Sequence, residues 1–146
     1  MEGVRSFPKF MKTFKKIEPL NNFQIIDKCK ELRIRNFKGV FMRDELKDIK
    51  SSKNECLILN HDDSSSGGTH WTCLFIKRGI AIYFDSYGFD LPLEVVDYCK
   101  GLNGYCSTFK IQEYNEVICG HYSIFMVYRL SNGNRFFDVL DELYRN

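Results

Sequence analysis

A cysteine stands where a polar loop meets an apolar run that has helical spacing. The stretch "QEYNEVICGHYSIFMVY", residues 112–128, changes character at Cys119 and Gly120. The first N–H groups of a helix lack partners within the helix and carry partial positive charge, which stabilises a thiolate. Gly120 lets the backbone pack tightly, or a substrate approach closely, behind the sulfur. Cys119 is therefore a candidate nucleophile, with a buried core thiol as the alternative.

A thiolate nucleophile needs a general base, and the chain has three histidines. His121 follows Cys119 by two residues and faces away from it on a helix. His61 stands beside two aspartates at the start of a Ser/Gly-rich loop. His70 follows that loop and begins a β-rich run, which places its imidazole at the rim of a sheet. We therefore expect His70 to be the base.

A hairpin links a carboxylate to this histidine. The runs "HWTCLFIK" and "IAIYFDS" meet at Arg78-Gly79, and a two-residue turn there pairs Lys77 with Ile80. In that register Asp85 lies diagonal to His70 on one face of the sheet, within reach of a hydrogen bond. Asp85 would then orient the imidazole, as the acid of a triad does. A three-residue loop would turn Asp85 to the other face, and Asp85 as an ordinary strand-end cap is the other interpretation.

A glutamine seven residues before the cysteine completes the set. Gln112 precedes the loop that leads into Cys119. Its amide could donate, together with the Cys119 backbone N–H, to the oxyanion that forms when a thiolate attacks a carbonyl. These groups occur in the order His, Asp, Gln, Cys, each at the boundary of an element, and together they predict nucleophilic catalysis by a thiol.

The elements that position these groups predict an α+β fold: a small, mostly antiparallel sheet packed against helices, with the nucleophile at the N-terminus of a central helix. We read residues 1–20 as an irregular basic arm. The pattern predicts strands at 55–61, 70–77, 80–86 and 107–112. It predicts helices from Asn21 or Asn22 to about 34, a short one at 44–46, and others at 93–101, 119–130 and 135–145.

Composition indicates one globular domain with reduced thiols. The 146 residues are 44% hydrophobic and 27% charged, and their six cysteines include no Cys-x-x-Cys pair. We therefore expect no zinc or other metal site and no disulfide framework. No run is long enough to span a membrane and no secretory signal is evident, so we expect a soluble intracellular protein and, by default, a monomer.

Charge is unevenly distributed along the chain. Residues 1–53 hold 14 Lys or Arg against 7 Asp or Glu, and residues 54–146 hold 7 against 12, which gives a net charge of +2. The basic front half is suited to a polyanion such as DNA. A solvated surface that only keeps the protein soluble is an equally good interpretation.

Three blocks, "GGTHW", "YFDSYG" and "QEYNEVICGHYSIFMVY", resemble the His-Trp, Asp and Gln-x6-Cys-Gly blocks of the adenovirus-type maturation cysteine proteases (adenain-like). The likeness is greatest to the cysteine proteases of Polinton/Maverick elements and adenovirus-like DNA viruses. It runs from about Phe23 to the final helix, so it implies a single cysteine protease domain at residues 21–146, preceded by the 1–20 arm. Proteases for ubiquitin-like modifiers share the architecture and the residue order.

The resemblance implies a role for each residue. Cys119 would be the nucleophile, His70 the base, Asp85 the orienting acid and Gln112 the oxyanion donor. Trp71 matches the tryptophan that walls the family's catalytic groove.

The resemblance also implies a thiol endopeptidase that cleaves viral or mobile-element precursors, such as capsid-type proteins, at small-residue or glycine-containing sites. Virion maturation in the host nucleus or the virion would be its setting. No cofactor is required by the sequence, although the resemblance implies a DNA or peptide activator. Cys106 is not assigned the role of the cysteine that forms a disulfide with such a peptide, because its resemblance to that cysteine is weak. A deconjugating protease for ubiquitin-like modifiers is the first alternative, and a catalytically silent nucleic-acid-binding module is the second.

Overall fold

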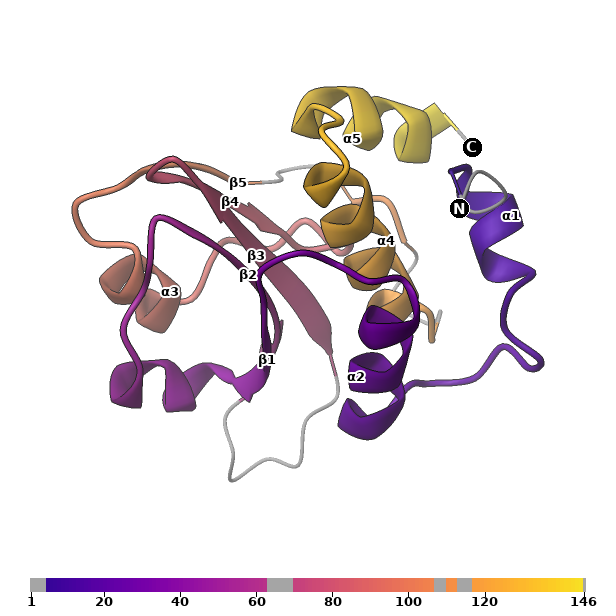
Figure 1. The fold of residues 1–146 in the computed structure, drawn as a ribbon, viewed down its shortest axis with the longest axis horizontal. Helices are drawn as coiled ribbons and strands as arrows, with labels where there is room; N and C mark the ends of the chain where they lie inside the picture. Colours follow the sequence, from indigo (N-terminus) through magenta and orange to yellow (C-terminus); the bar gives the residue numbers. More distant parts are fainter. Residues whose placement is uncertain (1–4, 63–69, 107–109, 113–116, 146) are drawn as a thin grey trace.

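The computed structural model describes residues 5–62, 70–106, 110–112 and 117–145. Its elements are, in chain order, α1 (Phe7–Met11), α2 (Asn22–Glu31), β1 (Phe37–Met42), the 3-10 helix η2 (Arg43–Asp48), β2 (Asn54–Asn60), β3 (Trp71–Lys77), β4 (Ile80–Phe84), α3 (Leu93–Tyr98), β5 (Asn103–Cys106), α4 (Cys119–Ser131) and α5 (Phe136–Arg145). The α+β class expected from the sequence is confirmed (Figure 1).

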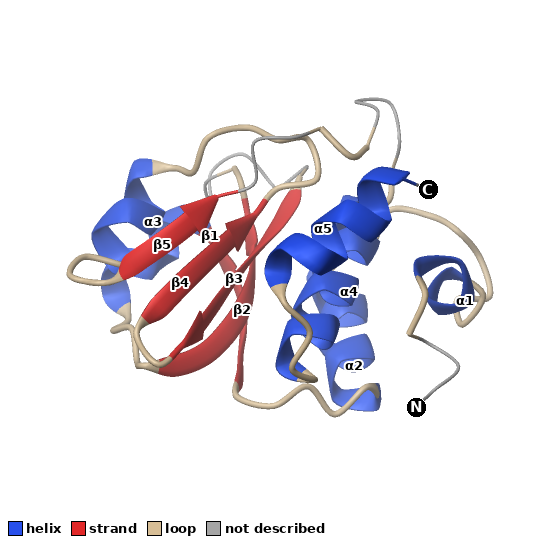
Figure 2. Ribbon diagram, turned by 90° about the horizontal axis from the view of Figure 1, so that it is seen from above, coloured by secondary structure: helices blue, strands red, loops and turns tan. Residues whose placement is uncertain are grey.

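The sheet lies between two helical layers (Figure 2). Successive side chains of a strand point to opposite faces of a sheet. Ile58 and Cys73 accordingly pack with α2, α4 and α5, whereas Leu57 and Leu74 pack with α3 and η2. Burial on both faces explains why β2 reads as a nearly continuous apolar run instead of alternating. The central strands are therefore rigidly held.

The strand order is β1-β2-β3-β4-β5. The three central strands pair antiparallel, but β1 pairs parallel with β2 and β5 pairs parallel with β4. The sheet is thus mixed, whereas the sequence led us to expect a mostly antiparallel one. Helical connections cause the difference. The chain crosses one face of the sheet through α3 after β4, so β5 begins at the same end of the sheet as β4 and runs parallel to it.

The β3–β4 hairpin has the predicted register. Lys77 pairs with Ile80 and Cys73 with Phe84. Arg78 and Gly79 both have positive φ, 53° and 78°. A two-residue turn with positive φ at both central positions matches the right-handed twist of the flanking strands.

Helix α4 is the central helix of one layer. All residues from Cys119 to Leu130 are buried, and α4 packs against β3 as well as α2 and α5. Helix α2 begins as predicted: Asn21 Oδ1 accepts the Gln24 N–H at 2.9 Å, and Gln24 Oε1 accepts the Asn21 N–H at 2.8 Å. The predicted helices at 119–130 and 135–145 are confirmed within a few residues.

The N-terminal segment differs from its prediction as an irregular arm. Residues 7–11 form α1, and Phe10 is fully buried in the core shared with α4. Phe7 stacks on Tyr122 with ring centroids 4.5 Å apart. Aromatic contacts with α4, invisible in the local pattern, supply the burial that orders this short helix. Residues 1–4 lie outside the described residues.

The last predicted strand is wrong where it can be judged. Residues 107–109 lie outside the described residues, and 110–112 are irregular. The observed edge strand, β5, lies before these residues in the chain. Pairing with β4, and not the β-propensity of its own residues, determines where this strand forms. None of the described helices has the length and apolar character needed to cross a membrane.

Candidate active site

Cys119 occupies the first position of α4, where the sequence predicted it. Its side chain is buried, and Sγ accepts a hydrogen bond from the backbone N–H of Trp71 at 3.4 Å. The N-cap residue, Ile118, makes no side-chain capping hydrogen bond. The helix N-terminus therefore directs its partial positive charge toward the sulfur.

His70 and Asp85 form the hydrogen bond that the hairpin register predicts. His70 Nε2 lies 2.6 Å from Asp85 Oδ1, and both side chains are buried. Asp85 also accepts the Tyr87 N–H on the same oxygen, at 2.8 Å. The carboxylate thus holds the imidazole and also caps the turn after β4, and its role in catalysis stays a prediction.

The surroundings of His70 favour its charged form. Burial alone lowers the pKa of the imidazole, but the hydrogen bond to Asp85 and the neighbouring Cys119 thiol raise that pKa to about 9. The second ring nitrogen, Nδ1, is buried and has no hydrogen-bond partner that satisfies normal geometry within the described part of the chain. An imidazolium next to a thiol is the electrostatic setting in which a thiolate is stabilised.

Gln112 is fully buried and is held by the segment that follows Asp85. Ser86 donates its hydroxyl to Gln112 Oε1 at 2.5 Å. The backbone N–H groups of Ile111 and Gln112 both donate to the Ser86 carbonyl, at 2.8 and 3.0 Å. One segment therefore contacts the imidazole through Asp85 and the amide through Ser86.

Trp71 and Gly120 pack together beside Cys119. Trp71 is only 9% exposed, and its indole N–H donates to the Leu20 carbonyl at 2.8 Å. A Cβ added to Gly120 would lie 3.3 Å from Trp71 Cδ1 and 3.4 Å from Leu20 Cβ. Of the two reasons offered for a glycine here, tight packing is the one the structure supports. The predicted contact of Trp71 and Gly120 with substrate stays a prediction.

The other two histidines have different surroundings. His121 is fully buried, with its ring against Phe14 at 4.6 Å between centroids. Burial and nearby Lys28 lower the pKa of His121 to about 4. The His61 ring lies 6.1 Å from that of His70, so it borders the site. The proximity of His61 to His70 was not predicted, because the two residues are nine positions apart in the sequence.

Other described thiols are poor nucleophiles. Burial raises the pKa of Cys56 to about 12 and that of Cys99 to about 11, and it also raises the pKa of Cys29 and Cys73. These four remain protonated at neutral pH. Within the described ranges, no group of three or more His, Cys, Asp or Glu side chains is arranged to hold a metal ion.

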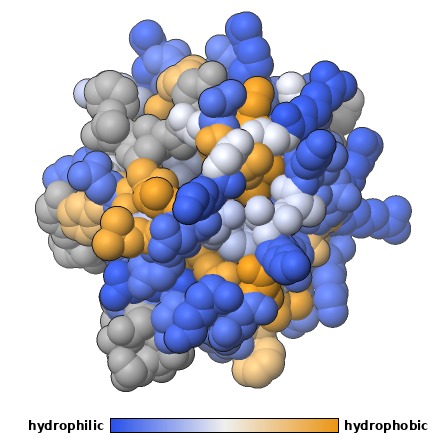
Figure 3. Space-filling view, turned by 90° about the vertical axis from the view of Figure 1, so that its left-hand side faces the viewer, coloured by the Kyte–Doolittle hydropathy of each residue, from blue (hydrophilic) through white to orange (hydrophobic). Residues whose placement is uncertain are grey.

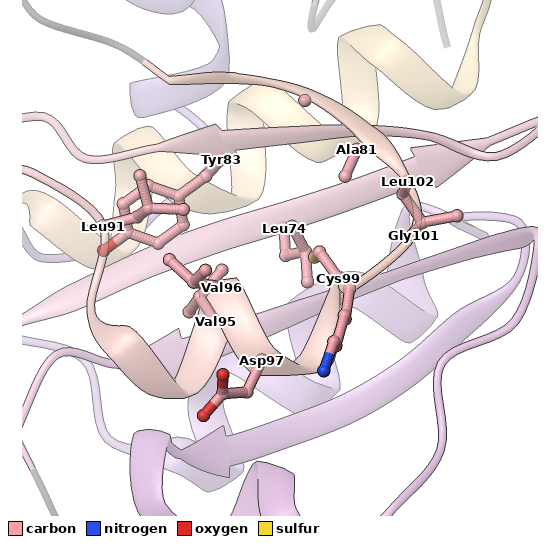
Figure 4. A pocket seen from close by; sticks show the side chains of 12 residues that line it. Leu74, Ala81, Tyr83, Leu91, Val95, Val96, Asp97, Cys99, Gly101 and Leu102 are labelled. Carbon is pink, nitrogen blue, oxygen red and sulfur yellow. The ribbon is translucent and has the colours of Figure 1, made fainter.

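A cavity of about 440 Å³ lies on the face of the sheet opposite to Cys119 and α4 (Figure 4). Leu74 and Ala81 of the strands, Val95 of α3 and Leu102 line it, and none of the four predicted catalytic residues does. The surface around α3 and η2 shows hydrophobic side chains among hydrophilic ones (Figure 3). The cavity is therefore separate from the group around Cys119.

Sequence reasoning missed three side chains of the site. Ser86 and Tyr87 directly follow Asp85, and Tyr87 stacks on the His70 ring at 4.0 Å between centroids and 9° between planes. Ser123 donates to the Cys119 carbonyl at 2.9 Å, and its hydroxyl lies 3.2 Å from the Trp71 carbonyl. The sequence signal that could have identified Ser86 and Tyr87 is their position next to Asp85 in "YFDSYG". No local sequence pattern indicated a role for Ser123.

The fold is similar to that of a solved protease. No family model and no curated protein matches the sequence. The crystal structure of the ASFV pS273R protease superposes with a TM-score of 0.66 at 17% identity, over 88% of this chain and 65% of that chain. Its selenomethionine form gives 0.64 at 16% identity, over 88% and 66%. The chain spans just under two thirds of that protease's length and has its α+β fold.

Proposed function

We propose that this chain is a cysteine endopeptidase with Cys119 as its nucleophile. The observation that carries the proposal is the buried His70–Asp85 hydrogen bond beside the Cys119 thiol, at the start of the central helix. The fold shared with the ASFV pS273R protease supports it. A histidine that is paired with a buried carboxylate and lies next to a thiol is typical of a catalytic site.

The reacting form is the ion pair in which the Cys119 proton lies on His70, whose charged form Asp85 stabilises. The thiolate attacks the scissile carbonyl, and a tetrahedral intermediate forms. As it collapses, His70 returns the proton to the leaving amine and a thioester remains. Water, activated by His70, hydrolyses the thioester and restores the thiol.

The oxyanion of the intermediate is stabilised by Gln112 and by the backbone N–H of Cys119. Gln112 Oε1 accepts the Ser86 hydroxyl, so the NH2 end of the amide is the end suited to donate to an oxyanion. The Cys119 N–H belongs to the uncapped first turn of α4. Loss of one such donor typically lowers the rate about 10²–10³-fold.

The substrate class we propose is a viral or mobile-element precursor cleaved at glycine-containing or other small-residue sites. The three sequence blocks that resemble adenovirus-type maturation proteases support this, and so does the similarity of the fold to that of the ASFV pS273R protease. Processing of a capsid-type precursor would place the enzyme in virion maturation. A deconjugating protease is distinguished by activity on conjugates of ubiquitin-like modifiers and none on the precursor.

Substitutions test the proposal by cleavage of a fluorogenic peptide with Gly-Gly before the scissile bond. Cys119→Ala and His70→Ala should reduce kcat/KM by about 10³-fold or more, and Asp85→Ala by less. Cys99→Ala is the matched control, because it removes a half-buried thiol distant from His70 and should leave kcat/KM within about twofold. Unchanged turnover in folded Cys119→Ala would refute the proposal.

A further inference from the structure

Three consecutive residues after β4 contact both halves of the proposed catalytic machinery. Asp85 binds His70, Ser86 binds Gln112, and Tyr87 stacks on His70. We infer that Ser86 and Tyr87 are positioning residues, Ser86 for the oxyanion amide and Tyr87 for the imidazolium. The inference rests on the proposed function and adds two residues to it.

Ser86 makes three hydrogen bonds to the segment of Ile111 and Gln112. Its carbonyl accepts the N–H groups of Ile111 and Gln112, which attaches the backbone of this segment to the end of β4. Its hydroxyl donates to Gln112 Oε1. Because Ser86 and Gln112 are both fully buried, the amide is confined to the orientation that this bond selects. Without the hydroxyl, the amide oxygen would lose a hydrogen bond that favours this orientation.

Tyr87 acts on His70 in two ways. Its backbone N–H donates to Asp85 Oδ1, the oxygen that also accepts from His70, and so keeps the carboxylate in place. Its ring lies parallel to the imidazole at 4.0 Å. The face of an aromatic ring attracts a cation, so the stack favours the imidazolium over the neutral imidazole. The backbone contact survives substitution of the side chain, but the stack does not.

The protonation of His70 responds to every group that faces it. Asp85, after β4, and Cys119, on α4, stabilise the charge and outweigh burial, so the pKa is about 9. The His61 ring, after β2, lies 6.1 Å away. The Tyr87 ring covers one face of the imidazole. Removing that ring should therefore lower the pKa of His70 while the other three groups stay.

The pH profile tests Tyr87. With the Gly-Gly fluorogenic peptide, the alkaline limb of kcat/KM should move down by about half a pH unit or more in Tyr87→Leu, which keeps the imidazole covered by an apolar side chain. Tyr87→Phe retains the ring and should restore the wild-type limb. Titration of the His70 ring by NMR should show the same shift without reference to turnover. An unmoved His70 titration in folded Tyr87→Leu would overturn this half of the inference.

A double-mutant cycle tests Ser86. Ser86→Ala should lower kcat by about tenfold with KM and the alkaline limb unchanged, since only the transition-state donor is disturbed. Ser86→Ala combined with Gln112→Ala should be no slower than Gln112→Ala alone, because both act through one amide. Full additivity of the two losses would overturn the role of Ser86. Failure of the protease proposal itself would look different: the wild-type chain would then neither cleave the peptide nor react with an electrophilic analogue of it.

Discussion

At the scale of single residues, two histidines of one chain, His70 and His121, have opposite pKa shifts because their neighbours differ. Asp85 and Cys119 raise the pKa of His70 to about 9 against the effect of burial, which favours the charged form of its ring. Burial and Lys28 lower the pKa of His121, so its ring is neutral at neutral pH. The sequence had already set His121 apart, since it is two residues from the cysteine, and the environments of the two rings explain why their pKa values differ.

His121 should make the protein sensitive to acid. Its folded-state pKa, about 4, lies below the unfolded value of 6.5, so its stabilising contribution is complete above pH 6.5 and is lost as the pH falls toward 4. His121→Phe removes this titration. Between pH 7 and 4.5, the variant should lose about 2 kcal/mol less free energy of unfolding than the wild type, measured by urea denaturation. Equal losses in the two proteins would contradict the assignment.

At the scale of elements, the sequence predicted what local patterns determine. The turn dipeptide and the two β-rich runs that flank it predicted the hairpin, and with it the His70–Asp85 bond. The junction at Cys119 predicted where α4 begins. The edge strands β1 and β5 and the helix α1 were not predicted, because each forms through contacts with elements distant in sequence. For the same reason the roles of Ser86 and Tyr87 in the site became visible only in three dimensions.

Helix α1 should contribute to stability through Phe10. This side chain is fully buried, with its ring 5.4 Å from Phe125 and 5.2 Å from Phe14. Phe10→Ala should lower the free energy of unfolding by about 3 kcal/mol. Phe23→Ala removes the same side chain at a position that is 70% exposed, and we expect a change under about 0.5 kcal/mol. Similar small effects for both variants would contradict the packing of α1 on α4.

At the scale of the whole molecule, the segments before α2 and after α4 converge on the same helical layer (Figure 1). Arg129 of α4 donates to the Arg5 carbonyl at 2.7 Å and to the Glu142 carboxylate of α5 at 2.7 and 3.2 Å. The proposed active site and the α3 cavity occupy opposite sides of the sheet. The class of the fold was predictable from the order of elements, whereas the parallel edge pairings depended on how the connections cross the sheet.

The basic front half leads us to propose salt-sensitive DNA binding as an accessory property. Lys12, Lys15 and Lys16 are exposed on the N-terminal segment. Affinity for a duplex oligonucleotide, measured by fluorescence anisotropy, should fall by more than about tenfold between 50 and 300 mM salt. Replacing these three lysines with Gln should reduce the slope, whereas Lys77→Gln and Lys100→Gln, in the acidic half, should not. Equal affinity at the two salt concentrations would refute the proposal.

The most direct test of the central claim is covalent labelling by a peptide whose C-terminal glycine carries a vinyl methyl ester, followed by mass-spectrometric mapping. Of the six cysteines, Cys119 should be the one modified, and His70→Ala should abolish the modification. Cys99, half-buried with a raised pKa, serves as the internal control and should remain unlabelled. An unmodified Cys119, or labelling of Cys119 and Cys99 at equal rates, would contradict its role as the nucleophile.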